Sequence, residues 1–310
     1  MNGLKKSLAL GYILAISGGI FWAVGGACGQ YLFQHNHMTS NWLVPVRLTI
    51  SGILLLLFAL LRGENLLSVW KTKQDIFDIL LFGLLGSALC QYGYYTSIQY
   101  SNVALATVLA YMSPAMILVY TVIKEQRLPK LYEAVCVLLV VAGAFVCTTH
   151  LNPGSLAVTP EALFWGLISA ASFVVYTMQP RRLLQKFDLV MIIGWGMVIG
   201  GITLILLFRP WTIHVTVNST LFLNMAVVIL FGTVFSFCFY QAGVTIVGSI
   251  TGSILSSVEP VASMIISVLF LQVPLTLLDF AGFILILASI PIIALGDKKR
   301  YTKQQDRNKT

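Results

Sequence analysis

Glu259 is the residue of this sequence with the clearest chemical potential, because it is a carboxylate inside a long apolar stretch, directly before Pro260. A carboxylate in such surroundings is costly unless it faces a cavity or a partner. Desolvation favours its neutral form, and an approaching cation or polar solute would favour ionisation. Helical spacing puts Gly252, Ser256 and Ser263 on the same face. This small, polar face predicts a cavity wall. The alternative is a protonated Glu259 that hydrogen bonds to nearby serines and serves helix packing.

Aromatic and amide side chains form a second group of candidates. A tyrosine hydroxyl far from water needs a partner, and a polar cavity can supply one. Together with Glu259 these side chains predict a binding site for a small solute. The predicted substrate-binding residues are Trp22, Gln91, Tyr92, Tyr95, Tyr111, Tyr176, Tyr240, Gln241, Ser256 and Glu259, with Tyr94 in the same cluster. For at least half of them, hydrogen bonding between helices is the competing interpretation.

Two prolines and one arginine complete the candidates. Pro114 and Pro260 interrupt apolar stretches at matching places, and a proline inside a helix frees a carbonyl and bends the helix. We therefore predict that both act as hinges. Arg47 stands just inside its apolar stretch, and we expect it to snorkel to the surface. Its alternative is to turn inward as a counter-charge.

The sequence lacks the common motifs of catalysis and of metal binding. It contains no phosphate-binding loop that ends in Gly-Lys-Ser/Thr, no His-Glu-x-x-His and no Gly-x-Ser-x-Gly. The five cysteines have no metal-ligand spacing, and the histidines fall in predicted outer loops. We therefore predict no enzyme activity, no metal site and no cofactor.

The composition identifies the environment in which these residues must work. Of 310 residues, 58% are hydrophobic and 10% charged, and the mean hydropathy is +0.88. A soluble domain is about 25% charged. The bilayer must therefore be the solvent. The net charge of +8 then indicates contact with anionic lipid head groups and not with nucleic acid.

Apolar stretches of about 20 residues can each cross the hydrocarbon core as a helix. Residues 79–123 and 215–258 carry no charge, and as single helices they would be about twice as long as the membrane is thick. Each stretch must therefore turn back, the first at Ser101-Asn102 and the second at Gly248-Ser249. The predicted architecture is all-α with ten transmembrane helices. They span 9–33, 42–61, 77–98, 103–123, 132–149, 162–179, 189–208, 221–244, 248–271 and 275–295.

The basic residues test this topology independently. With both termini in the cytoplasm, all but two of the 19 Lys and Arg residues fall in cytoplasmic segments, and only Arg47 and Arg209 remain on the other side. This distribution follows the positive-inside rule. We therefore predict a multi-pass protein of the cytoplasmic membrane with both termini inside.

The two halves of the chain repeat each other. The charge-free pairs of spans align with a shift of 146 residues, which puts Gly86 on Gly232, Tyr94 on Tyr240 and Pro114 on Pro260. The sequence predicts a five-helix repeat over 1–150, a second over 151–300 and a short polar tail over 301–310. Because five is odd, the second repeat enters the membrane from the opposite side, as in the inverted repeats of secondary transporters. Duplication kept only for folding is the alternative.

The spans and motifs together resemble the EamA-type branch of the drug/metabolite transporter superfamily over about residues 10–296. The segment from Tyr111 to Met116 is similar to the fourth-span motif of that family. Residues 257–262 are similar to its second-half counterpart, and residues 45–48 to the start of its second span. The resemblance implies a secondary carrier whose central cavity is walled by the first, third, fourth, sixth, eighth and ninth spans. It also implies that the Glu-Pro pair is usual in the family, so that Glu259 is also a candidate structural element.

These observations predict a secondary transporter that moves a small metabolite by alternating access. An amino acid or related solute, carried in the direction of export, is the leading substrate. Protons are a candidate coupling ion, lipids are the other partner, and the oligomeric state stays open. An organic cation or drug is the alternative within transport, because an aromatic cavity with one carboxylate suits a cation. A non-transporting receptor or an intramembrane enzyme is the alternative outside it.

Overall fold

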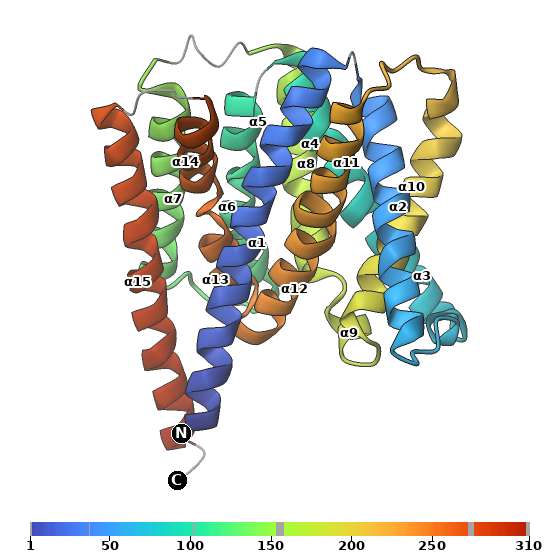
Figure 1. The fold of residues 1–310 in the computed structure, drawn as a ribbon. Helices are drawn as coiled ribbons and strands as arrows, with labels where there is room; N and C mark the ends of the chain where they lie inside the picture. The colour runs from blue at the N-terminus through green and yellow to red at the C-terminus, as the bar shows by residue number, and fades with distance from the viewer. Residues whose placement is uncertain (1, 37, 102, 153–157, 272–275, 308–310) are drawn as a thin grey trace.

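The chain folds into a bundle of long helices that run roughly side by side (Figure 1). The computed structural model describes residues 2–36, 38–101, 103–152, 158–271 and 276–307. No strand occurs among these residues. The helices of the first half are α1 (Asn2–His35), α2 (Ser40–Leu61), η1 (Ser68–Trp70), α3 (Lys73–Leu81), η2 (Phe82–Ala88), α4 (Leu89–Tyr100), α5 (Val103–Ala110), α6 (Met112–Lys124) and α7 (Leu131–Thr149).

The second half of the chain is equally helical. Its helices are α8 (Pro160–Met178), α9 (Arg181–Leu184), α10 (Leu189–Phe208), η4 (Pro210–Thr212), α11 (Ser219–Ile229), η5 (Leu230–Phe235), α12 (Ser236–Val247), α13 (Ser249–Ser256), α14 (Glu259–Leu271) and α15 (Leu277–Arg307). Polar residues begin several of these helices. The side chains of Thr159, Asp188 and Asn218 accept hydrogen bonds from backbone N–H groups in the first turns of α8, α10 and α11, which satisfies donors that have no partner within the helix.

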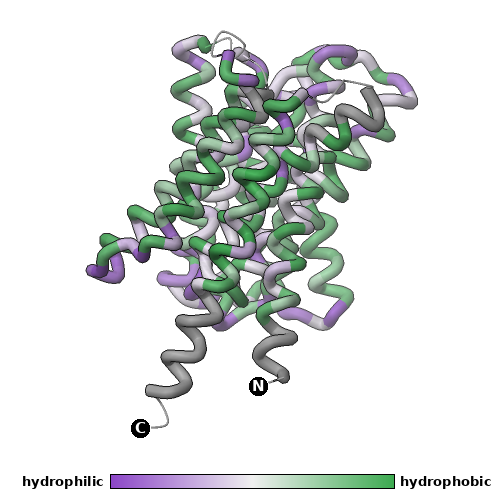
Figure 2. Tube along the Cα trace, turned by 90° about the vertical axis from the view of Figure 1, so that its left-hand side faces the viewer, coloured by the Kyte–Doolittle hydropathy of each residue, from purple (hydrophilic) through white to green (hydrophobic). Residues whose placement is uncertain are grey.

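The chain is a multi-pass membrane protein. Eight helical stretches of the described chain are long and apolar enough to cross a membrane, and the shorter apolar helix 131–146 is a further apolar element. Figure 2 shows hydrophobic residues along the length of the bundle and hydrophilic residues gathered towards its two ends. α1 begins and α15 ends at the same end of the bundle (Figure 1).

The expected turns are found where the sequence breaks the apolar stretches. Gly248 has φ +90° between α12 and α13, a conformation that glycine adopts without steric cost. Ser101 ends α4, whereas Asn102 lies outside the described residues. The expected ninth span, 248–271, is not one helix but the broken pair α13 and α14.

Two π-helical segments, η2 and η5, were not predicted from the sequence. A π-helix carries one extra residue in a turn and is frequently found at functional sites. η5 packs on α1 so closely that a Cβ on Gly25 would collide with the Cα of Gly232. Because neither residue has a side chain, the two backbones meet directly.

Candidate functional site

A cavity opens in the middle of the bundle, where α1, α2, α4, α8, η5, α12 and α13 meet the breaks before α6 and α14. About 730 Å³ of space at this place is free of protein atoms, and part of that space is open to solvent. Its wall is mostly apolar and aromatic, with a few polar groups. The lining residues are Trp22, Arg47, Cys90, Gln91, Tyr94, Tyr95, Ala110, Tyr111, Ser113, Pro114, Ser169, Ala170, Phe173, Gly232, Phe237, Ser253, Ser256 and Glu259.

Arg47 forms a positively charged pole of this cavity. The side chain is 2% exposed, so the expectation that it snorkels to the surface is wrong. Its guanidinium donates to the Tyr95 hydroxyl at 3.2 Å, to the Thr233 hydroxyl at 3.4 Å and to the side-chain oxygen of Gln91. The guanidinium carbon also lies 4.2 Å from the centre of the Tyr95 ring. These partners hold the charge at depth, because a buried cation is tolerated when it is hydrogen bonded.

Donors without partners line the same cavity. Arg47 Nε, Gln91 Nε2 and Trp22 Nε1 are buried, and none of them has a hydrogen-bond partner among the described residues. Gln91 accepts from Arg47 through its oxygen, so its amide nitrogen stays free to donate. All three side chains line the cavity. The Arg47 pole is therefore suited to an acceptor-rich group such as a carboxylate.

Glu259 forms the second pole of the cavity. It is the first residue of α14, where the helix dipole favours a negative charge. The Tyr111 hydroxyl donates to its carboxylate at 3.1 Å. The nearby Ser253 and Ser256 hydroxyls donate to backbone carbonyls of their own segment. The carboxylate of Glu259 therefore has a tyrosine partner that the sequence did not suggest.

The helices break just before the two predicted hinge prolines. Pro114 is in the first turn of α6, after a break at Tyr111, and Pro260 is the second residue of α14. Proline is tolerated in a first turn because the N–H that it lacks has no partner there. The Ser113 hydroxyl donates to the carbonyl of Ala110 at 2.6 Å, the acceptor that Pro114 leaves without its helical donor. The prediction of one continuous helical face through Gly252, Ser256, Glu259 and Ser263 is therefore wrong, because the helix is interrupted between Ser256 and Glu259. Ser256 and Glu259 nevertheless both line the cavity.

The structure divides the predicted site residues into two groups. Those that line the cavity are Trp22, Gln91, Tyr95, Tyr111, Pro114, Ser256 and Glu259, and those outside its lining are Tyr92, Tyr176, Tyr240, Gln241 and Pro260. Tyr92 points elsewhere because its hydroxyl donates to Asn41 at 2.8 Å and its ring stacks on Phe208. Tyr240 bonds Thr177 at 2.9 Å.

Several lining residues were missed by the sequence reasoning. They are Cys90, Ala110, Ser113, Ser169, Ala170, Phe173, Gly232, Phe237 and Ser253. Position in the sequence was the available signal. Cys90 and Ser113 are next to predicted residues, and Phe237 lies one helical turn before Tyr240 and Gln241. Within the described chain, no group of three or more His, Cys, Asp and Glu residues is placed to hold a metal ion.

Comparison with known proteins agrees with this architecture. The chain matches the EamA-like transporter family over residues 9–149 and again over 161–295. It is 32% identical over 290 residues to the "Uncharacterized inner membrane transporter YicL" of Salmonella typhimurium, which covers 94% of this chain and 97% of that protein. It is 25% identical over 255 residues to the "Uncharacterized transporter YetK" of Bacillus subtilis, over 80% of this chain and 75% of that one.

The fold is shared with a solved crystal structure. The two superpose with a TM-score of 0.76 at 17% identity, over 95% of this chain and 98% of the other. Likeness at this identity concerns the fold alone, whereas the family match covers nearly the whole chain in two consecutive segments. This membrane protein belongs to the EamA-like transporter family.

Proposed function

We propose that the chain is a secondary carrier that exports an amino acid or a closely related metabolite by alternating access. The observation that carries this proposal is that one cavity is lined by both Arg47 and Glu259. A buried charge is costly without a compensating partner. A zwitterion would meet the Arg47 pole with its carboxylate and the Glu259 pole with its ammonium group, so one small solute compensates both.

Several observations support ten spans in two inverted five-helix repeats, 1–150 and 151–300, followed by the tail 301–310. The helix break at Tyr111 and the break at Ser257 are 146 residues apart, and so are Gly86 in η2 and Gly232 in η5. Helix pairing is reciprocal as well. The first expected span of the first half, α1, packs on the third span of the second half, α12. In the same way, the first expected span of the second half, α8, packs on the third span of the first half, α4.

Alternating access follows from this symmetry. Two oppositely oriented halves can open the same cavity to one side or the other by equivalent changes in packing. The breaks before Pro114 and Pro260 are the places where α6 and α14 could turn, because no helical hydrogen bond crosses a proline nitrogen. Both prolines therefore remain proposed hinges.

The orientation and direction complete the proposal. The asymmetry of Lys and Arg favours a cytoplasmic location for both termini, and the relative named as an inner membrane transporter supports the cytoplasmic membrane as the location. Export is the direction that the family resemblance favours. Glu259 is the proposed proton site if protons are coupled to transport.

An organic cation is the second candidate, because aromatic rings crowd the wall of the cavity that Glu259 also lines. Trp22 lies 5.7 Å from Phe173 and 5.0 Å from Phe237, measured between ring centres, and such a wall suits cation–π contact. The two candidates make opposite predictions for Arg47. A zwitterion needs the guanidinium, whereas a cation is repelled by it.

The experiment is a binding and flux comparison with Arg47→Gln and Glu259→Gln in proteoliposomes. For a zwitterionic substrate, both variants lower affinity and counterflow of labelled amino acids. For an organic cation, Glu259→Gln abolishes binding and Arg47→Gln strengthens it. Unchanged uptake of both solute classes in both variants would contradict a substrate site at this cavity.

A further inference from the structure

One face of α8 runs from the cavity towards the end of the bundle where α1 begins. Ser169 and Phe173 on this face line the cavity. Tyr176 follows one turn later and is fully buried. Gln179 follows next and donates to the backbone oxygen of Asp78 at 3.0 Å. The same helix face thus connects the cavity with the polar surface at that end.

Polar groups without partners lie on this route. Tyr176 OH, both side-chain polar atoms of Gln241 and the Ser87 hydroxyl are buried and have no hydrogen-bond partner among the described residues. Tyr176 packs 5.1 Å from Phe237, one turn before Gln241, and its neighbour Thr177 bonds the hydroxyl of Tyr240. Gly86, beside Ser87, lies against the backbone of Tyr176. Since buried polar groups are nearly always satisfied, these groups are suited to meet water or a polar solute.

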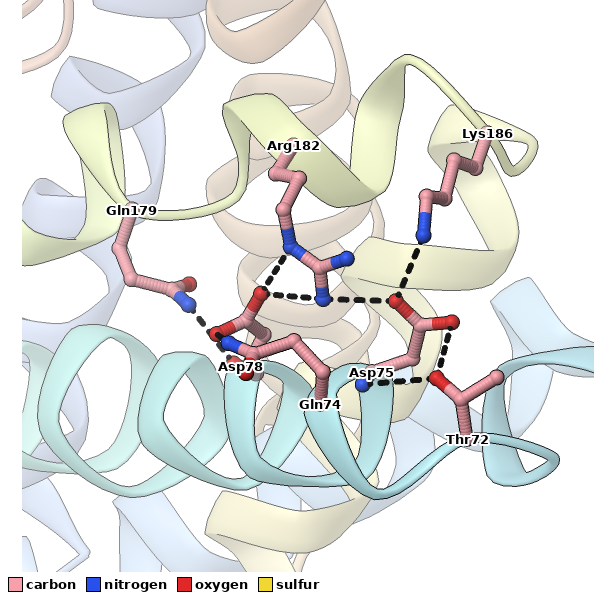
Figure 3. Close-up of polar contacts among 7 residues, drawn as sticks. All are labelled: Thr72, Gln74, Asp75, Asp78, Gln179, Arg182 and Lys186. Carbon is pink, nitrogen blue, oxygen red and sulfur yellow. Dashed lines mark hydrogen bonds and ion pairs between the residues drawn. The ribbon is translucent and has the colours of Figure 1, made fainter.

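The route ends in an ion-pair cluster, defined here as Asp75, Asp78, Arg182 and Lys186 (Figure 3). Figure 3 shows the guanidinium of Arg182 between the two carboxylates, at 2.6 Å from Asp75 and 2.5 Å from Asp78. Lys186 approaches Asp75 at 3.3 Å. The carboxylates come from α3 in the first half, and the cations from α9 and the segment after it in the second half.

The two cations of the cluster reach water, because Arg182 is 36% exposed and Lys186 48% exposed, whereas the carboxylates of Asp75 and Asp78 are only 4% and 12% exposed. Water can therefore solvate the two cations when they leave α3. The α3 side is held independently, because the Thr72 hydroxyl donates to Asp75 at 2.7 Å. Arg181 also donates to Ser249 at the start of α13 at 2.7 Å, so a movement of the Arg181–Leu184 helix reaches α13, which lines the cavity.

We propose that Ser87, Tyr176 and Gln241 line the inner half of the solute path and that the ion-pair cluster is the gate that closes it. In this structure the gate is closed, and Phe173, Tyr176 and Phe237 fill the path below the cavity. When the Arg181–Leu184 helix leaves α3, the partnerless polar groups meet water and solute. The proposal rests on the carrier function proposed above.

The test uses a cysteine reporter on the path. Ser87→Cys is introduced into a chain whose native cysteines are replaced, and its reaction with a membrane-impermeant maleimide is timed in inside-out and right-side-out vesicles. With the cluster intact, we expect slow reaction from both sides. With Arg182→Gln, we expect the rate to rise about tenfold or more in inside-out vesicles alone.

A matched control is available in another ion pair. Arg127 bonds Glu133 at 2.7 Å, but both residues belong to the first half. Arg127→Gln should leave the Ser87→Cys rate unchanged. Equal rates in the Arg182→Gln variant and the parent, or an equal rise with Arg127→Gln, would overturn the proposal.

A second measurement distinguishes an opened gate from a misfolded chain. Asp78→Cys and Arg182→Cys together allow the gate to be tied by a short bifunctional thiol reagent. Tying should keep the inner path closed, and reductive release of a cleavable reagent should reopen it. Labelling needs no substrate, so a change in labelling without any flux would support the gate and contradict the carrier. Flux that persists through the tied protein would contradict the gate alone.

Discussion

Gln91 accepts a hydrogen bond from Arg47 through its side-chain oxygen, and its amide nitrogen is left without a partner among the described residues. The charge of Arg47 therefore fixes which end of the amide is available to a solute. This relationship joins α2 to α4 and turns two separate side chains into one donor group.

Gln91→Glu should remove this donor group without enlarging the cavity. The new carboxylate would pair with Arg47 and neutralise the pole, so affinity for a zwitterion should fall by about tenfold or more, the value of one hydrogen bond to a charged group. Titration by thermal shift measures the affinity. Gln91→Leu leaves the charge of Arg47 unneutralised, so this variant should lose less affinity for the zwitterion than Gln91→Glu. A Gln91→Glu variant that binds as tightly as the parent would contradict the role of this pole.

The contact of Gly25 with Gly232 should tolerate no side chain. An added Cβ would collide with the opposite backbone, and overpacking of this kind costs about 1–3 kcal/mol. We expect Gly25→Ala to lower the melting temperature in detergent. Gly26→Ala is the matched control, because the nearest atom to its added Cβ is the Tyr94 hydroxyl oxygen at 3.9 Å. Equal melting temperatures in the two variants would show that α1 and η5 can separate at no cost.

The proposed hinges should affect movement more than binding. Alanine at 114 and 260 restores the missing N–H groups and favours continuous helices through the breaks. Pro114→Ala with Pro260→Ala should therefore slow flux severalfold while the affinity for the solute stays within about twofold, less than one neutral hydrogen bond is worth. Pro291→Ala, inside α15, is the control and should leave both unchanged. A parallel loss of affinity and flux would argue for a structural role of the prolines.

The sequence predicted the helical architecture well because its signals are local. Long apolar stretches and the glycine at 248 each act within a limited stretch of chain. The π-helical segments were not predicted, because one extra residue in a turn does not visibly change the hydropathy pattern. The break before Glu259 was not predicted, because Pro260 is compatible both with a bend in one helix and with the start of a new helix.

The site was predicted only in part because side-chain direction is a tertiary property. Tyr92 and Tyr95 have the same residue type on the same helix, yet Tyr92 meets Asn41 and Phe208 while Tyr95 meets Arg47. Arg47 itself stands near the end of an apolar stretch, where snorkelling is a sound expectation. What turned it inward is the set of partners on α4 and η5, and these become neighbours only in the folded protein.

Tyr95 and Tyr92 therefore provide the sharpest test of the cavity as the solute site. Tyr95→Phe removes one of the two acceptors of Arg47 Nη1 and leaves the Thr233 hydroxyl as the other. The guanidinium can then shift, so affinity should change by up to about tenfold, the upper value of one neutral hydrogen bond. Tyr92→Phe removes an equivalent hydroxyl, bonded to Asn41 at 2.8 Å, and should lower only the melting temperature. Binding and melting measurements on both variants separate the two effects. A larger loss of affinity in Tyr92→Phe than in Tyr95→Phe would place the solute on the Asn41 side of α4, outside the cavity.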